Sequence, residues 1–81
     1  MTSAIVLVNC RFPFDSRIVD KIAVMPHVST LHRTKGRYDL ILQITEQSDA
    51  KLQELISMYI EKIPGVDAAI SLTVAKEHLA R

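Results

Sequence analysis

The sequence predicts an α+β fold, namely a ferredoxin-like βαββαβ sandwich of the dimeric α+β barrel type. Two observations predict it. Apolar residues pass from strand-like to helical spacing and back twice along the 81 residues. The segments Met25–Val28 and Ile63–Val66 each join a helix to a strand, and Pro26 and Pro64 lie 38 positions apart, about the length of one βαβ unit. A chain of this length is expected to form a single domain over residues 1–81.

The first unit begins with a strand and continues into a helix. Residues 4–8 form an unbroken apolar run rich in β-branched side chains, which is typical of a central strand. Asp15 is placed to cap a helix in which Ile18 and Ile22 have helical spacing. Pro26 then ends that helix, because the residue before a proline avoids helical angles.

Two strands joined by a tight turn follow. Residues 28–34 favour a strand by composition, although their alternation is poor. Residues 35–37 predict a hairpin turn, in which Gly36 is free to take a positive φ. Residues 38–45 form a clearer strand, with the apolar positions that start at Leu40 alternating onto one face.

A second helix and a last strand complete the repeat. Ser48 or Asp49 is expected to cap the helix, and Pro64 with Gly65 to end it. Its expected apolar stripe consists of Leu52, Leu55, Ile56, Tyr59 and Ile63. The last strand alternates, and its two expected faces are Val66, Ala68, Ile70, Leu72 and Val74 against Asp67, Ala69, Ser71 and Thr73. Residues 75–81 are expected to form a short tail or helical turn.

In this fold both helices cover one face of the sheet, so the other face stays open. The residues expected on the open face are Ile41, Gln43, Ala69, Ser71, Thr73 and alternate residues of the first strand. Such a mixed face is either solvated or packed on a second copy of the chain. We favour the homodimer, because oligomerisation is a usual source of stability for a domain with so small a core.

Composition excludes several classes of protein. The net charge of +1 lacks the basic excess that nucleic-acid binders usually carry, so no direct nucleic-acid partner is expected. Cys10 is the single cysteine, which excludes an intrachain disulfide and favours the reducing cytoplasm. No signal peptide and no apolar run of about 20 residues is present, so no membrane association is expected.

Few residues suggest catalysis. His27, His32 and His78 lack zinc-ligand spacing, so no metal and no cofactor are expected. Cys10 beside Arg11 has one ingredient of a nucleophile but no assigned base, so an inert thiol is favoured and the chain is not expected to be an enzyme.

Asp39 stands just past the predicted turn and has two interpretations. It bonds N–H groups of the turn, or it holds the ammonium group of a bound amino acid, with Arg37 and Lys35 opposite the carboxylate. A turn that offers a cation, an aromatic ring from Tyr38 and an acid complements a zwitterion.

The stretch Thr34–Leu42 resembles the turn of the effector-binding domain of the Lrp/AsnC family, in which a Thr, a Gly, an aromatic residue and an Asp open the third strand. Ile63–Val66, which closes the second helix, is similar to a second motif of that family. The resemblance extends from about Ala4 to Val74 and implies an effector-binding domain that regulates amino-acid metabolism.

That resemblance also implies partners and a site. Relatives form dimers that associate further, often into octamers, and bind amino acids at contacts between dimers. The implied ligand-binding residues here are Thr34, Gly36, Arg37, Tyr38, Asp39 and Ser71, while Ala69 stands where relatives often have Thr. Because the chain starts at the first strand, we expect a stand-alone domain without a helix-turn-helix, which acts by joining a full-length Lrp/AsnC regulator.

Two other functions remain open at this point. An enzyme of the dimeric α+β barrel type, such as a decarboxylase or an oxygenase, would need a His or Arg that points into the cavity between the sheets. His32 or Arg33 would supply it, since they alternate on the second strand. The other alternative is a scaffold that only oligomerises.

Overall fold

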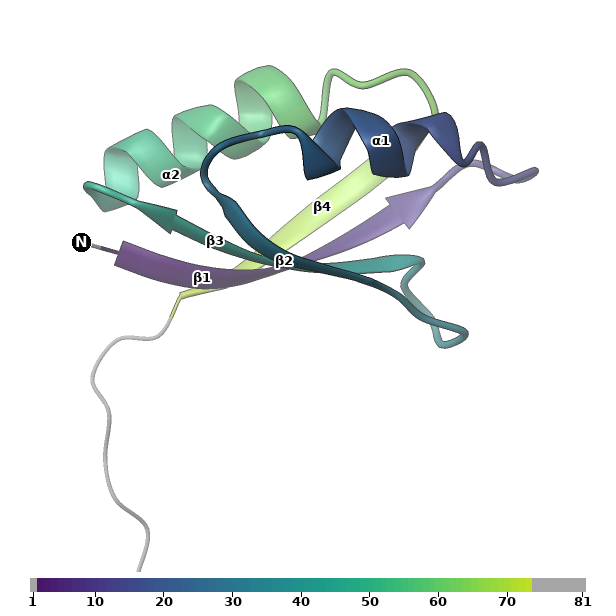
Figure 1. Cartoon of the computed structure of the whole chain (residues 1–81), viewed down its shortest axis with the longest axis horizontal. Coiled ribbons are helices and arrows are strands. Elements are labelled where there is room, and N and C mark those ends of the chain that lie inside the picture. Colours follow the sequence, from purple (N-terminus) through teal and green to yellow (C-terminus); the bar gives the residue numbers. More distant parts are fainter. Residues whose placement is uncertain (1, 74–81) are drawn as a thin grey trace, which may run out of the picture.

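The computed structural model describes residues 2–73 and confirms the predicted βαββαβ order (Figure 1). Its elements are β1 (Thr2–Cys10), α1 (Arg17–Ala23), β2 (Val28–Arg33), β3 (Leu40–Glu46), α2 (Asp49–Leu55), its continuation η1 (Ile56–Ile60) and β4 (Val66–Thr73). Predictions made for the side chain of Thr73, for Val74, for His78 and for the tail 75–81 lie outside the described residues.

The strands form one sheet in the order β2-β3-β1-β4, and every neighbouring pair is antiparallel. Both helices lie on the same face of this sheet (Figure 1). β1 is a central strand, as its unbroken apolar run predicts. Its alternation buries Ala4, Val6 and Val8 beneath the helices, while Ile5 and Leu7 lie half-buried on the open face.

The core lies between the sheet and the helix layer. Its buried side chains are Ala4, Val6, Val8, Ile18, Ile22, Leu40, Leu42, Ile44, Leu52, Leu55, Ile56, Ile60, Ile63 and Val66. All of them are aliphatic, so their burial removes apolar surface from water and leaves no buried side chain to satisfy with a hydrogen bond.

Ser48 caps α2 as predicted, whereas the N-cap position of α1 is Ser16, whose side chain makes no capping hydrogen bond, and Asp15 lies one residue before it. The carboxylate of Asp15 accepts from the backbone N–H of Arg17 at 2.9 Å and also pairs with the Arg17 guanidinium. The Ser48 hydroxyl accepts from the N–H of Lys51 at 3.2 Å, which selects Ser48 over Asp49 as the cap of α2. Each of these hydrogen bonds to a backbone N–H satisfies a donor that the first helical turn leaves free.

The second helix departs from its predicted stripe at one position. After Leu55 the helix widens into a π-helix, and the N–H of Glu61 donates to the carbonyl of Ile56 at 2.9 Å. The wider turn holds an additional residue. Ile60 is therefore fully buried, while Tyr59, predicted to be in the stripe, is 58% exposed.

The two faces of β4 were also predicted wrongly, and a β-bulge is the reason. Cys10 pairs with Val66 but Asn9 pairs with Ala68, so Asp67 has no partner opposite it. Val66 faces the core. Beyond the bulge the alternation is reversed, and Ala68 and the following even-numbered residues face the open side.

The glycine with a positive φ is Gly65, and Gly36 does not use the freedom that its turn would allow. Gly65, at the junction with β4, has φ 97°, and a Cβ there would lie 2.9 Å from Cδ1 of Ile18. Gly36 does not have a positive φ, and a Cβ on it would meet its nearest neighbour, Oγ1 of Thr34, at an ordinary 3.9 Å. Glycine is therefore required by the backbone at Gly65 and not at Gly36.

Candidate functional site

The turn between β2 and β3 contains five of the six predicted ligand-binding residues, Thr34 to Asp39. Its ends are joined by a hydrogen bond from the N–H of Thr34 to the carbonyl of Asp39 at 3.0 Å. The Thr34 hydroxyl donates to the carbonyl of Tyr38 and accepts from the N–H of Gly36 at 3.2 Å. The Thr34 hydroxyl thus holds the backbone of the turn in place through two hydrogen bonds. The side chain of Arg37 is exposed.

Asp39 fastens this turn to the centre of the sheet. Its N–H donates to the carbonyl of Val8 at 2.9 Å, and its Oδ2 accepts from the N–H of Cys10 at 2.7 Å. The prediction that Asp39 bonds N–H groups of the turn is therefore wrong, because the N–H that its carboxylate accepts from belongs to Cys10 at the end of β1. Burial and the negative charge of Asp39 both raise the pKa of the Cys10 thiol, with burial the larger cause.

Ser71, the sixth predicted residue, lies apart from the turn. Ser71 is on β4, where it pairs with Val6 of β1. The turn joins β2 to β3, and β1 lies between β3 and β4 in the sheet. Ser71 faces the helices, not the open side as predicted, and its hydroxyl accepts from Nε2 of Gln53 on α2 at 3.2 Å. A single chain does not bring Ser71 together with the turn.

The open face of the sheet is more apolar than predicted. The bulge in β4 replaces Ala69 and Ser71 there with Ile70 and Leu72, which are 44% and 54% exposed. Pairing places these side chains beside Ile5, Leu7 and Ile41. The result is an apolar patch across β3, β1 and β4, defined by Ile5, Leu7, Ile41, Ile70 and Leu72.

His32 belongs to the same open face, because it pairs directly with Ile41. Arg33 instead faces the helix layer, where its guanidinium lies 4.2 Å from the centre of the Phe14 ring. His32 thus meets the condition set for a dimeric barrel enzyme. Among the paired strand residues of this face, however, there is no carboxylate, Lys or Arg that would serve as its acid–base partner.

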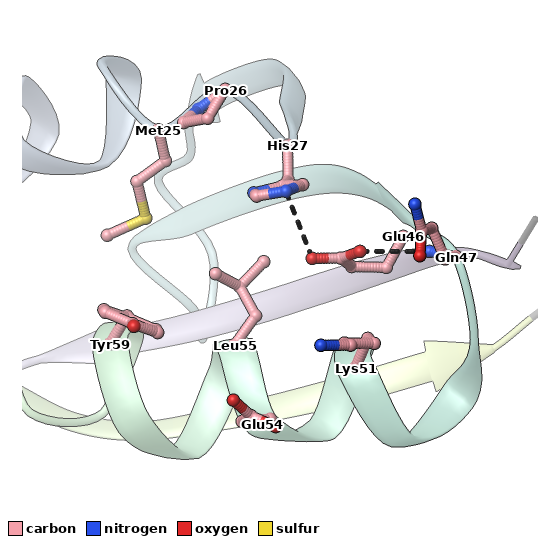
Figure 2. Close-up of a pocket in the computed structure, with 9 residues that line it drawn as sticks. All are labelled: Met25, Pro26, His27, Glu46, Gln47, Lys51, Glu54, Leu55 and Tyr59. Atoms are coloured by element: carbon pink, nitrogen blue, oxygen red, sulfur yellow. Dashed lines mark hydrogen bonds and ion pairs between the residues drawn. The ribbon is translucent and has the colours of Figure 1, made fainter.

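A pocket of about 430 Å³ opens between the end of α1 and the second helix, where sequence reasoning proposed no site (Figure 2). It is lined by Met25, Pro26, His27, Glu46, Gln47, Lys51, Glu54, Leu55 and Tyr59. Nε2 of His27 lies 3.2 Å from Oε2 of Glu46, whose side chain is 11% exposed. The feature of the sequence that could have indicated this pocket is Pro26–His27, which connects α1 to β2. This connection brings His27 next to Glu46, the last residue of β3.

The charged groups of residues 2–73 do not form a metal centre. No cluster of three or more His, Cys, Asp or Glu side chains occurs there. In the same part of the chain, no helix combines the length and the apolar character needed to cross a bilayer.

The fold and the turn define a class: a ferredoxin-like domain whose helices cover one sheet face and whose β2–β3 turn carries the polar side chains. The family model of the Lrp/AsnC ligand binding domain matches residues 3–81. The chain therefore belongs to the Lrp/AsnC ligand-binding domain family. This match confirms the resemblance that the Thr34–Leu42 and Ile63–Val66 motifs indicate.

Solved structures share the fold. TTHA0845 from Thermus thermophilus is 22% identical, with a TM-score of 0.88 over 99% of this chain and 100% of that chain. FFRP-DM1 is 23% identical, with a TM-score of 0.86 over 93% of this chain and 100% of that chain. At these identities the likeness concerns the fold.

A longer protein shares the fold over part of its length. The transcriptional regulator NMB0573 from Neisseria meningitidis, solved as a complex with L-Met, is 22% identical with a TM-score of 0.85. The alignment covers 98% of this chain and 53% of the regulator, so the chain spans about half its length. No curated protein matches the sequence.

Proposed function

We propose that this Lrp/AsnC-type domain binds an amino acid and oligomerises. The observation that carries the proposal is the β2–β3 turn, where Thr34, Gly36, Tyr38 and Asp39 resemble the Thr, Gly, aromatic and Asp of the family's turn. Hydrogen bonds within the turn and to β1 hold these residues in place before any ligand arrives. A preformed loop loses less conformational entropy on binding.

The chemistry of the turn suits a zwitterion. Arg37 and Lys35 are exposed cations that would hold a carboxylate, and Asp39 would hold an ammonium group. Oδ2 of Asp39 already accepts one hydrogen bond, but an ionised carboxylate accepts several, so capacity for the ammonium group remains. The complex of NMB0573 with L-Met makes L-methionine the first ligand to test.

Assembly would complete the site. The apolar patch of Ile5, Leu7, Ile41, Ile70 and Leu72 supports a homodimer formed through the open sheet faces, since packing a second copy on it would remove this area from water. Within one chain, Ser71 and the β2–β3 turn lie apart. Ser71 would therefore contact the ligand from one chain while the turn of a neighbouring dimer contacts it from the other side. Such contacts between dimers would build the higher oligomer, expected to be an octamer.

The proposal has consequences for the cellular role. A domain of this kind in the cytoplasm would act without catalysis and without a cofactor. It would influence transcription by joining a full-length Lrp/AsnC regulator and altering that regulator's assembly when the amino acid binds. Direct contact with nucleic acid is not part of the proposal, in keeping with the net charge of +1.

Calorimetric titration with L-methionine and the other common amino acids tests the proposal, together with sedimentation before and after addition. Asp39→Asn is the informative variant, because an amide oxygen still accepts from Cys10 N–H while the charge on the ligand's ammonium group is lost. We expect its affinity to fall about tenfold or more. Asp20→Asn, an exposed carboxylate on α1, is the matched control. If no amino acid binds the unmodified protein, the proposal is wrong.

A further inference from the structure

The pocket on the helix layer lies within one chain and away from the β2–β3 turn. It is formed by the α1–β2 connection, the end of β3 and one flank of α2 and η1. Because this layer is opposite the open sheet face, a dimer formed through the sheets would leave the pocket accessible (Figure 1). Its volume of about 430 Å³ is in the range of small-molecule sites.

Figure 2 shows that the pocket has an apolar end and a polar end. Met25 and Tyr59 lie at one end and Leu55 lies between the ends. The opposite end holds His27 and Glu46, with Lys51 beside them. This division suits a ligand with an apolar body and a charged head group.

The π-helix shapes the apolar end. By adding a residue to the turn it gives the inward position to Ile60 and places Tyr59 at the rim of the pocket. A π-helical turn is less favourable than an α-helical one and is often kept at functional sites. Here it leaves a half-exposed aromatic ring where a ligand's apolar part would pack.

The charges at the polar end decide the class of ligand. Glu46 is nearly buried, and its oxygens accept from the N–H of Gln47 at 3.0 Å and contact His27 at 3.2 Å. Within residues 2–73, neither Lys51 nor Glu54 has an ion-pair partner. A simple anion would face the two carboxylates, and a simple cation would face Lys51. Only a ligand with both charges complements this lining.

We infer that this pocket is a second binding site, which takes a small zwitterion with an apolar side chain, such as an apolar α-amino acid. The Lys51 ammonium group holds the ligand's carboxylate, and the carboxylate of Glu46 faces its ammonium group, while Glu54 adds negative charge along the α2 flank of the pocket. The apolar side chain packs against Met25 and Tyr59. The inference does not depend on the proposed function of the turn, because no residue is shared between the two places.

The two tyrosines allow each place to be observed separately. The chain has two Tyr and no Trp, with Tyr38 in the turn and Tyr59 in the pocket. Tyrosine emission of the Tyr38→Phe protein therefore reports on the pocket, and that of the Tyr59→Phe protein reports on the turn. Each titration uses L-leucine, L-methionine and L-phenylalanine separately. For L-phenylalanine, tyrosine is excited at wavelengths longer than those that the ligand itself absorbs.

In the Tyr38→Phe protein we expect saturable changes in Tyr59 emission with at least one of these amino acids. With L-leucine as the ligand, 4-methylpentanoate and 3-methylbutylamine test the two charges, because each keeps the apolar chain and lacks one charged group. We expect both to bind about tenfold or more weakly than the amino acid. Lys51→Met should weaken binding by a similar factor, and Lys62→Met, which changes an exposed lysine outside the pocket, should not.

The outcomes separate the two proposals. A response of Tyr38 without any response of Tyr59 overturns the second site and supports the turn. A response of Tyr59 without one of Tyr38 supports the second site and counts against the turn. Equal affinities in the Lys51→Met and Lys62→Met proteins, or tighter binding of a singly charged analogue than of the amino acid, would overturn the zwitterion assignment.

Discussion

The carboxylate of Asp39 accepts a hydrogen bond from the backbone N–H of Cys10 at 2.7 Å, across 29 positions of sequence. This bond joins the start of β3 to the end of β1, beside the bulge where β4 loses register. The same residue is the acid of the turn that resembles the family's motif. The contact between the two central strands and the geometry of the proposed ligand site therefore depend on one side chain.

Substitutions at Asp39 should separate these two roles. Asp39→Ala leaves the half-buried N–H of Cys10 without its partner, so we expect the free energy of unfolding to fall by about 1–2 kcal/mol. Asp39→Asn keeps an acceptor and should lose less than half of that. Urea denaturation followed by circular dichroism measures both, and equal losses would mean that the bond to Cys10 does not stabilise the fold.

Substitution of the two glycines should give opposite results. Gly65→Ala forces a positive φ on alanine and places its Cβ 2.9 Å from Ile18, so we expect a loss of about 1–3 kcal/mol. Gly36→Ala has room and no positive φ, so its effect should be within about 0.5 kcal/mol. Thermal unfolding of both variants checks this. Similar melting temperatures for the two would contradict the geometry described at Gly65.

A charge on the open face should dissociate the homodimer. Leu72→Glu places like charges in a contact between two copies of the sheet, whereas Met58→Glu adds the same charge on the helix layer at a similarly exposed residue. Sedimentation velocity should give a monomer for Leu72→Glu and the unchanged assembly for Met58→Glu. An unchanged assembly in both variants would rule out pairing through the sheets.

Asp15 should titrate at unusually low pH. Hydrogen bonds from the Arg17 side chain, then from its backbone N–H, lower the pKa of Asp15 from 3.8 to about 2. A lowered pKa in the folded state stabilises the fold above the unfolded pKa, and this contribution is lost as the pH falls from 3.8 to about 2. NMR titration should show a low midpoint that Arg17→Gln raises and Arg11→Gln leaves unchanged. An ordinary midpoint in the unmodified protein would contradict the pairing.

The local chemistry of the sequence was sufficient to predict the order of elements and the helix cap at Ser48, but it placed the cap of α1 at Asp15 where the structure has Ser16. It failed where tertiary packing overrides local periodicity. The π-turn buries Ile60 in place of Tyr59, and the bulge at Asp67 reverses the faces of β4. Neither feature changes the number or order of elements, so the predicted fold was correct. The predicted set of residues on the open face was partly wrong.

The residues of the candidate site also divide into those whose proximity the sequence could predict and those whose proximity it could not. Thr34 to Asp39 are contiguous, so their proximity follows from the chain itself, whereas the place of Ser71 depends on register and on the bulge. The pocket at His27 and Glu46 joins segments that are distant in sequence. Only the packed structure brings these two side chains together.

A crystal structure of the protein grown with its tightest-binding amino acid tests the central claim most directly. We expect sheets paired through Ile70 and Leu72, with the amino acid against Arg37 and Asp39 of one chain and Ser71 of a neighbouring chain within reach. Unpaired sheets, or density for the amino acid only at a place remote from every β2–β3 turn, would contradict the claim.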